Sequence, residues 1–292
     1  MLGAIIGDVA GSYYEVLEIN YLRQNGINRP YEERIKVLDK NVELFTSYSS
    51  VTDDSILTCS IYDAIKNGEF NYEKYLREYG LSEINLGLDQ YGRSRFGSGF
   101  TDWLKGNYQG ESYGNGAAMR ISPVGYLFDN LDDVKKHAYL ASIPSHNHPD
   151  ALKGAEAVAC AIYLLRNGYS KEDVITYIKN NYYELNFDLE DLQRNYKFSS
   201  KTSNSVPEAL YIFSISTDFE DSIRKAISIG GDTDTIACIV GSLSEAYYGI
   251  DLNMLEKVKP YLKEYMVDLL KDYYKELGDR NARYCKQVDK RM

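Results

Sequence analysis

Residues 149–167 read PDALKGAEAVACAIYLLRN, and this stretch shows which secondary structure dominates the chain. Its apolar residues recur at three- and four-residue spacing, as in a helix with one buried face: Ala151, Ala155, Val158, Ala159, Ile162 and Leu165. Gly168 follows as a helix stop, and Ser170 with Asp173 indicates a capped start for the next helix. The segment predicts a long amphipathic helix.

Two further segments carry the same period. From residue 234 onward, apolar residues keep helical spacing up to Gly249, and residues 252–277 predict two amphipathic helices flanking Pro260. Signs of strands are few, and strand and helix patterns do not alternate regularly. The sequence therefore predicts an all-α chain that forms a single domain over residues 1–292, with residues 251–292 as C-terminal packing helices.

The composition limits the classes of partner. The 292 residues are 44% hydrophobic and 26% charged, as in a globular protein, and the formal net charge is −10. Such an acidic chain is not expected to bind nucleic acid or an anionic membrane, because both require a basic surface. No stretch approaches the roughly 18 apolar residues of a membrane helix, and the N-terminus lacks the basic start of a signal peptide. We therefore expect no membrane segment, and we expect the protein to be a cytoplasmic monomer.

The four cysteines are far apart and show no C-x-x-C pairing: Cys59, Cys160, Cys238 and Cys285. Three of them lie among apolar neighbours and are predicted to be small core residues rather than redox or metal-binding groups. This usage is typical of a reducing compartment.

Two acidic clusters stand directly before apolar helical patterns, Thr52-Asp53-Asp54-Ser55 and Asp232-Thr233-Asp234-Thr235. Residues two apart on a helix point in nearly opposite directions, so one cluster can share a ligand only where the chain enters the helix. Asp, Thr and Ser are also preferred helix caps. However, a cap needs one side chain, and close carboxylates repel unless cations or protons neutralise them. Oxygen donors without Cys or His favour Mg²⁺ or Mn²⁺, and capping and metal binding remain equal alternatives at this point.

Five motifs along the chain together resemble the ADP-ribosylglycohydrolase family, the group typified by the dinitrogenase reductase-activating glycohydrolase. They occur in the family's order within residues 3–250: GDVAGSYYE at 7–15, TDDS at 52–55, SYGNGAAMR at 112–120, SHNHP at 145–149 and GGDTDT at 230–235. The resemblance implies a compact all-α fold with a dinuclear Mg²⁺ or Mn²⁺ centre. It also implies cleavage of the glycosidic bond that joins ADP-ribose to a protein side chain or another acceptor. Ser55 stands where many members have Thr, which keeps the hydroxyl group.

By position, the resemblance assigns the metal ligands, with Asp234 as the residue expected to bridge both ions: Thr52, Asp53, Asp54, Asp232, Asp234 and Thr235. Glu15 matches a family acidic residue near the metals, and the alternative is a surface carboxylate in a tyrosine-flanked turn. Asp8 is expected to be structural.

The resemblance places ADP-ribose contacts on a second set of residues, with Gly97 a looser match: Gly97, Ser112, Tyr113, Gly114, Asn115 and His146. Residues 87–116 hold eight glycines, and a glycine-bearing turn can expose successive backbone N–H groups to a pyrophosphate. His148 is expected to cap or pack. Arg120 is expected to form a structural ion pair outside the site.

The implied reaction is hydrolysis at C1″ of the distal ribose, through a transition state with oxocarbenium character. Glu15 or Asp53 would take the proton from the attacking water. Two other functions fit the same residues: a non-catalytic ADP-ribose binder, and a metal-dependent pyrophosphohydrolase acting on a nucleotide. The acceptor, whether arginine, serine, another side chain or a small molecule, is not decided by the sequence.

Overall fold

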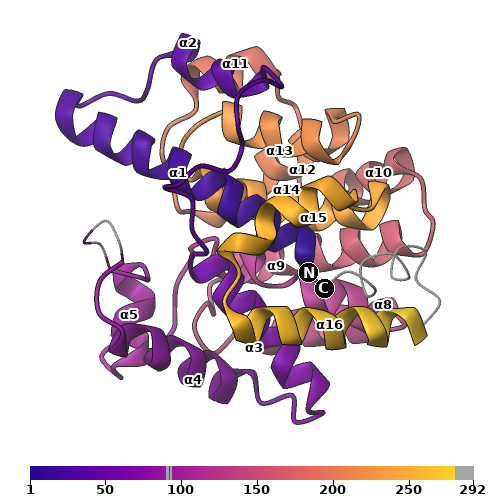
Figure 1. Ribbon diagram of the computed structural model, residues 1–292. Coiled ribbons are helices and arrows are strands. Elements are labelled where there is room, and N and C mark those ends of the chain that lie inside the picture. The colour runs from indigo at the N-terminus through magenta and orange to yellow at the C-terminus, as the bar shows by residue number, and fades with distance from the viewer. Residues whose placement is uncertain (90–91, 93, 280–292) are drawn as a thin grey trace.

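The computed structural model describes residues 1–89, 92 and 94–279 (Figure 1). Within these residues the regular structure is helical, and two isolated β-bridges are present without any strand. The predicted all-α class is therefore confirmed. The α-helices and short 3₁₀ helices (η) are α1 (Leu2–Asn25), α2 (Tyr31–Arg34), η1 (Ile35–Leu38), α3 (Asp53–Lys66), α4 (Tyr72–Asn85), α5 (Ser98–Leu104), α6 (Gly116–Met119), α7 (Ser122–Leu127), α8 (Leu131–Ser142), α9 (Pro149–Arg166), α10 (Lys171–Asn181), α11 (Leu189–Asn195), η2 (Thr202–Asn204), α12 (Val206–Ile215), α13 (Phe219–Ser228), α14 (Thr233–Tyr248), α15 (Leu252–Val258), η3 (Lys259–Tyr261) and α16 (Glu264–Asp279).

The helices predicted from apolar spacing are present with nearly the predicted limits. The segment 149–167 forms α9, and Gly168 follows it with a φ of +88°. Ser170 and Asp173 make the reciprocal hydrogen bonds of a capping box at the start of α10. Helix α14 ends at Tyr248 and is followed by Gly249, whose φ is +76°. Helices α15 and α16 flank the short η3 turn that contains Pro260.

Helix α1 begins in the middle of the molecule, where it packs against α14, and runs outward to one edge (Figure 1). Three glycines spaced four residues apart, Gly3, Gly7 and Gly11, lie on the side of α1 that faces α14. A Cβ atom at any of them would overlap the α14 backbone, so the two helices approach with main chain against main chain. Because the contacts run from Gly3–Gly241 to Gly11–Thr233, the helices are antiparallel, and the middle of α1 meets the start of α14.

One hydrophobic core includes residues from every long helix, between Met1 and Leu277. Cys59, Cys160 and Cys238 are buried in it as free thiols, as the sequence predicts. Cys285 lies outside the described residues.

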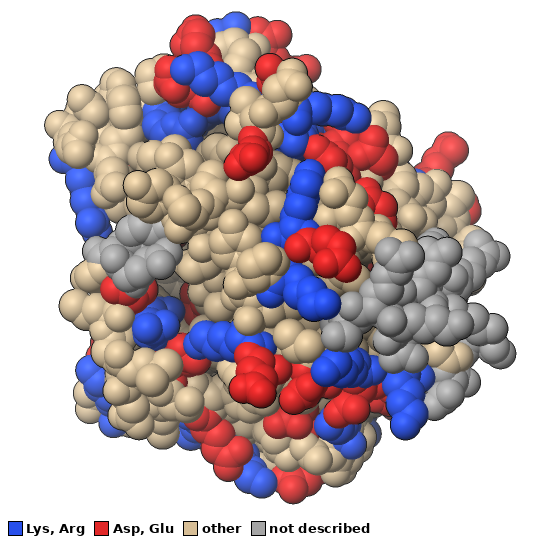
Figure 2. Space-filling view, in the orientation of Figure 1, with Lys and Arg blue, Asp and Glu red and all other residues tan. Residues whose placement is uncertain are grey.

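The surface carries mixed charge. On the face shown in Figure 2, Lys and Arg residues are interspersed with Asp and Glu residues. Among the helices of the described chain, none combines the length and the apolar composition needed to cross a lipid bilayer.

Candidate functional site

The first acidic cluster forms the N-terminus of α3, and Asp8 of α1 holds it in place. Thr52 is the N-cap residue, and its hydroxyl accepts a hydrogen bond from the Asp54 amide at 3.3 Å. The Asp8 carboxylate accepts from the Thr52 amide at 3.0 Å, the Thr52 hydroxyl at 2.7 Å and the Ser55 amide at 3.1 Å. The Ser55 hydroxyl also donates to Asp8. Asp8 thus satisfies the orphan N–H groups of a neighbouring helix, which is the structural part expected of it.

The second acidic cluster forms the N-terminus of α14. Gly230 and Gly231 precede it with φ values of +74° and +76°, a backbone conformation that favours glycine. A Cβ at Gly230 would overlap the Arg34 guanidinium, and one at Gly231 would overlap the Tyr196 ring. The tight turn therefore presents Asp232, the N-cap residue, and Asp234 of the first helical turn toward the same side.

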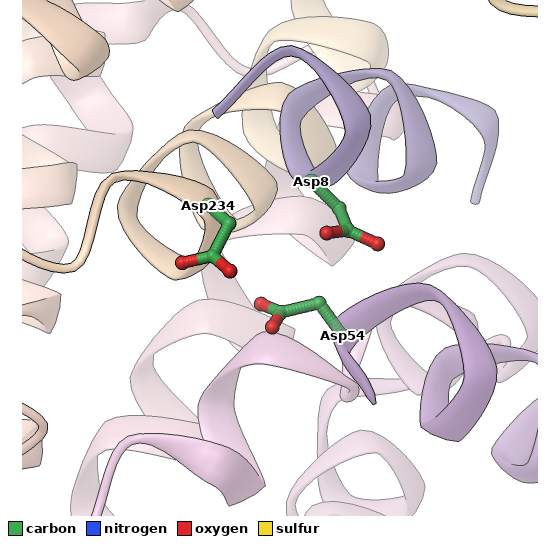
Figure 3. A group of neighbouring side chains, drawn as sticks. All are labelled: Asp8, Asp54 and Asp234. Atoms are coloured by element: carbon green, nitrogen blue, oxygen red, sulfur yellow. The ribbon is translucent and has the colours of Figure 1, made fainter. Parts of the chain in front are cut away.

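The two clusters and α1 meet in two overlapping groups of carboxylates. Asp8, Asp54 and Asp234 form one group, and their side chains point toward one another from α1, α3 and α14 (Figure 3). Glu15, Asp232 and Asp234 form the other. Within each group, one oxygen from every residue lies within 4.8 Å of the others. Glu15 therefore belongs to helix α1 and to the site, and the alternative of a surface carboxylate in a turn is wrong.

The negative charge of these carboxylates must be neutralised by cations or by protons. Burial, followed by repulsion from Asp234, raises the pKa of Asp54 and that of Asp232 well above the usual range. The same two causes raise the pKa of Asp8 to about 7. Moreover, Asp54 Oδ1 is buried without a hydrogen-bond partner in the described chain. Carboxylate oxygens are the ligands that Mg²⁺ and Mn²⁺ prefer, so each group can hold a divalent cation.

The carboxylates open into a cavity of about 470 Å³, a volume typical of small-molecule sites. Its walls come from the starts of α3 and α14, from α1, and from the loops around residues 94–100, 112–116 and 198–200. All the residues predicted as metal ligands line it: Thr52, Asp53, Asp54, Asp232, Asp234 and Thr235. So do most of the predicted substrate contacts: Gly97, Ser112, Gly114, Asn115 and His146.

Tyr113 lies apart from this lining. Its side chain is 52% exposed, and its ring meets His148 edge-on at 5.8 Å between centroids. Lys201 Nζ lies over the same ring, 5.6 Å from its centroid. His148 itself caps α9 by accepting a hydrogen bond from the Asp150 amide at 3.2 Å, as predicted.

The loop at 112–116 differs from the predicted row of free N–H groups. The Gly114 amide donates to the Ser112 hydroxyl at 3.1 Å, and the Asn115 amide donates to the Ser200 carbonyl at 2.9 Å. These two donors are therefore occupied within the protein. The Asn115 side-chain amide donates to Asp232 at 2.7 Å and to the Ser205 hydroxyl at 3.1 Å. Asn115 thus connects the loop to the second acidic cluster.

Arg120 is placed differently from the prediction. It lines the cavity, and its hydrogen bonds go to the Ala141 carbonyl and the Ser145 hydroxyl, neither of which is a carboxylate. Arg120 therefore lies at the site, and no ion pair links it to another of the described residues. A fully buried arginine is rare, and the apolar context of 117–121 gives no sign that its guanidinium faces a cavity. Phe198 and Ser200, which also line the cavity, have no recognisable motif around them.

Comparison with known proteins identifies relatives over nearly the whole chain. A family model described as ADP-ribosylglycohydrolase matches residues 1–286. ADP-ribosylhydrolase ARH3 of Homo sapiens is 24% identical, over 86% of this chain and 85% of that protein. ADP-ribosylarginine hydrolase Tri1 of Pseudomonas putida is 22% identical, over 86% of this chain and 70% of that one. A solved chain of an ADP-ribosylglycohydrolase-related protein complex shares the fold, with a TM-score of 0.66 at 20% identity, covering 94% of this chain and 95% of that one.

Proposed function

Because this chain belongs to the ADP-ribosylglycohydrolase family, we propose that it hydrolyses the glycosidic bond between ADP-ribose and an acceptor. The observation that carries the proposal is that two clusters of carboxylates meet at one cavity, whose wall includes the loop at residues 112–116 (the SYGNG loop). The acceptor would be a protein side chain or a small molecule, so that the reaction reverses ADP-ribosylation. We further propose that residues 1–292 act as one domain and as a cytoplasmic monomer, without a nucleic-acid partner, in keeping with the net charge of −10.

Six residues from the two clusters are proposed to hold two Mg²⁺ or Mn²⁺ ions: Thr52, Asp53, Asp54, Asp232, Asp234 and Thr235. Asp234 belongs to both carboxylate groups and is proposed to serve both ions. The unpartnered Asp54 Oδ1 and the raised carboxylate pKa values support cation binding at this position. When bound, such ions supply Lewis acidity that orients ribose hydroxyls and lowers the pKa of a water molecule.

The part of the cavity next to the carboxylates is proposed to hold ADP-ribose. The residues assigned to it are Gly97, Ser112, Tyr113, Gly114, Asn115 and His146. Since the Gly114 and Asn115 amides are occupied, recognition by this loop would rest on side chains rather than on those N–H groups. Tyr113 lies outside the cavity lining, and its half-exposed ring is proposed to contact an aromatic base.

The chain offers two carboxylates as the base. Glu15 projects from α1 into the cavity beside Asp232 and Asp234, and Asp53 borders the cavity at the start of α3. Either would take the proton from a water molecule that attacks C1″. The bond from C1″ to the acceptor breaks as positive charge develops on the ribose ring, and the surrounding carboxylates stabilise that charge. The electron pair of this bond stays on the acceptor atom, which takes up the proton that the base removed from water.

The decisive experiment removes metal with a chelator, restores Mg²⁺ or Mn²⁺, and offers arginine- and serine-linked ADP-ribosyl peptides. Chromatography should show intact ADP-ribose released only after metal is restored. Release of AMP would instead identify a pyrophosphohydrolase, and binding without release would identify a non-catalytic ADP-ribose binder. Asp234→Ala should abolish release while the helical circular dichroism spectrum is retained. Loss of that spectrum would return the cluster to a capping role.

A further inference from the structure

Three buried polar residues at the cavity, Arg120, Ser145 and His146, are joined by hydrogen bonds. Arg120 Nη2 donates to Ser145 Oγ at 2.8 Å, and Ser145 Oγ lies 2.8 Å from His146 Nδ1. All three side chains are buried, and Arg120 and His146 both line the cavity. These hydrogen bonds therefore connect the cationic guanidinium of Arg120 to the imidazole of His146 at the site.

The donors and acceptors of these three side chains allow only one placement of the shared protons. A guanidinium can only donate, so Ser145 Oγ is the acceptor of the Arg120 bond. The Ser145 hydroxyl proton then has a single acceptor within reach in the described structure, His146 Nδ1. If Nδ1 carried a proton, the buried hydroxyl proton would have no partner, which is unfavourable. Nδ1 is therefore the acceptor, and a neutral His146 carries its proton on Nε2.

The imidazole is also held in its neutral form. Burial, and then the positive charge of Arg120, lower the pKa of His146 well below its usual value. Burial lowers the pKa of Arg120 to about 9, so the guanidinium remains charged at neutral pH. The charge thus stays on Arg120, and His146 remains neutral.

The Nε2 side of His146 faces the SYGNG loop. A Cβ atom at Gly116 would lie 2.8 Å from Nε2, and one at Gly114 would lie 3.8 Å from it. Nε2 makes no hydrogen bond to the described residues, although His146 borders the cavity. Glycine at these positions leaves room for a ligand atom to approach the Nε2–H group.

We propose that Arg120 and Ser145 are positioning residues that lock His146 as a neutral Nε2–H donor toward an acceptor oxygen of ADP-ribose. The ligand part of this inference rests on the proposed function. A locked donor suits a phosphate, ribose hydroxyl or ring oxygen, and it repels a ligand group that can only donate. In this role Arg120 and Ser145 act through His146.

The tautomer is tested directly by nitrogen-15 NMR of histidine side chains, without ADP-ribose. The chain has three histidines, and His146→Asn identifies the His146 signals by their loss. We expect a protonated Nε2 and an unprotonated Nδ1 in the wild type. Ser145→Ala should give a mixture of tautomers or the Nδ1–H form, and Ser145→Thr should restore the wild-type pattern. An Nδ1–H form in the wild type, or an unchanged Nε2–H form in Ser145→Ala, would overturn the proposal.

Calorimetric titration with ADP-ribose then measures the consequence. Losing the alignment of one neutral hydrogen bond should weaken binding by roughly 2- to 12-fold in Ser145→Ala, with recovery in Ser145→Thr. Ser142→Ala is the matched control, because Ser142 is a buried hydroxyl three residues away that donates only to the Ala138 carbonyl. Equal weakening in that control would assign the loss to general destabilisation and refute the positioning role. If wild-type protein with the Nε2–H form fails to bind ADP-ribose, the proposed function fails and the tautomer lock stands.

Discussion

Gly7 of α1 lies directly against the carbonyl oxygen of Ala237 in α14, so that a Cβ atom could not be placed there without moving one helix. This contact sets the distance between α1, which carries Asp8 and Glu15, and α14, which carries Asp234. The geometry of both carboxylate groups therefore depends on a residue that has no side chain.

Gly7→Ala should lower the free energy of unfolding by about 3 kcal/mol or more, at the upper end of overpacking effects, because backbone rather than a flexible side chain opposes the new methyl group. Denaturant titration measures this. Gly99→Ala is the control, because a Cβ there meets nothing within 4 Å. A Gly7→Ala protein as stable as the Gly99→Ala protein would show that the helices can separate at little cost.

How well a helix can be predicted from the sequence depends on the contrast between its buried and exposed sides. Helix α9 has a strong contrast between its buried and exposed sides, and Ser170 and Gly168 mark clear boundaries. Residues 2–12 of α1, in contrast, are buried on all sides, so no apolar stripe stands out from a polar one. The four-residue spacing of Gly3, Gly7 and Gly11 was the available signal for this close packing.

The sequence predicts part of the candidate site. The positions of the two acidic clusters are predictable, because an Asp/Thr cluster directly before an apolar helical run is recognisable in the sequence, and both clusters begin helices. The directions in which individual side chains point cannot be predicted from the sequence, because they depend on tertiary packing. Asn115 points to Asp232, and Arg120 reaches the cavity through packing among residues distant in sequence.

Asn115→Ala should weaken Mg²⁺ binding by roughly 10- to 100-fold, because Asp232 loses the amide that orients its carboxylate. The shift of the melting temperature with Mg²⁺ concentration measures the affinity. Asn186→Ala, at an exposed amide outside the cavity lining, is the control. Equal Mg²⁺ affinity in the two variants would exclude an orienting role for Asn115.

The turn before the second acidic cluster rests on a buried ion pair. Arg34 Nη2 lies 3.0 Å from Glu18 Oε2, both side chains are almost fully buried, and the Arg34 guanidinium occupies the space beside Gly230. Glu18→Gln should destabilise the protein by about 3–5 kcal/mol, because it leaves a buried guanidinium without its counter-charge. Glu33→Gln, which breaks a solvent-exposed pair with Lys36, should leave the stability almost unchanged, because water screens that pair. Similar losses in both variants would argue against the buried pair as a support of the turn.

Metal-free protein should lose stability as the pH rises. The folded-state pKa of Asp8 is about 7, above the value of 3.8 for an unperturbed aspartate, so the folded state binds more protons than the unfolded state between these values. The carboxylate contribution is therefore most favourable at low pH, declines as the pH rises toward 7, and is fully unfavourable above it. Between pH 8 and pH 6.5, chelated protein should melt at a progressively higher temperature.

Two changes should remove this dependence by neutralising the same charges. Millimolar Mg²⁺ should raise the melting temperature more at pH 8 than at pH 6.5, because cations and protons compete for the same oxygens.

Asp54→Asn should raise the melting temperature of the chelated protein at pH 8, since it removes one of the repelling carboxylates and Asp54 Oδ1 has no partner to lose. The same variant should reduce the stabilisation by Mg²⁺. A chelated wild-type protein whose melting temperature falls from pH 8 to pH 6.5 would contradict the electrostatic account of the site.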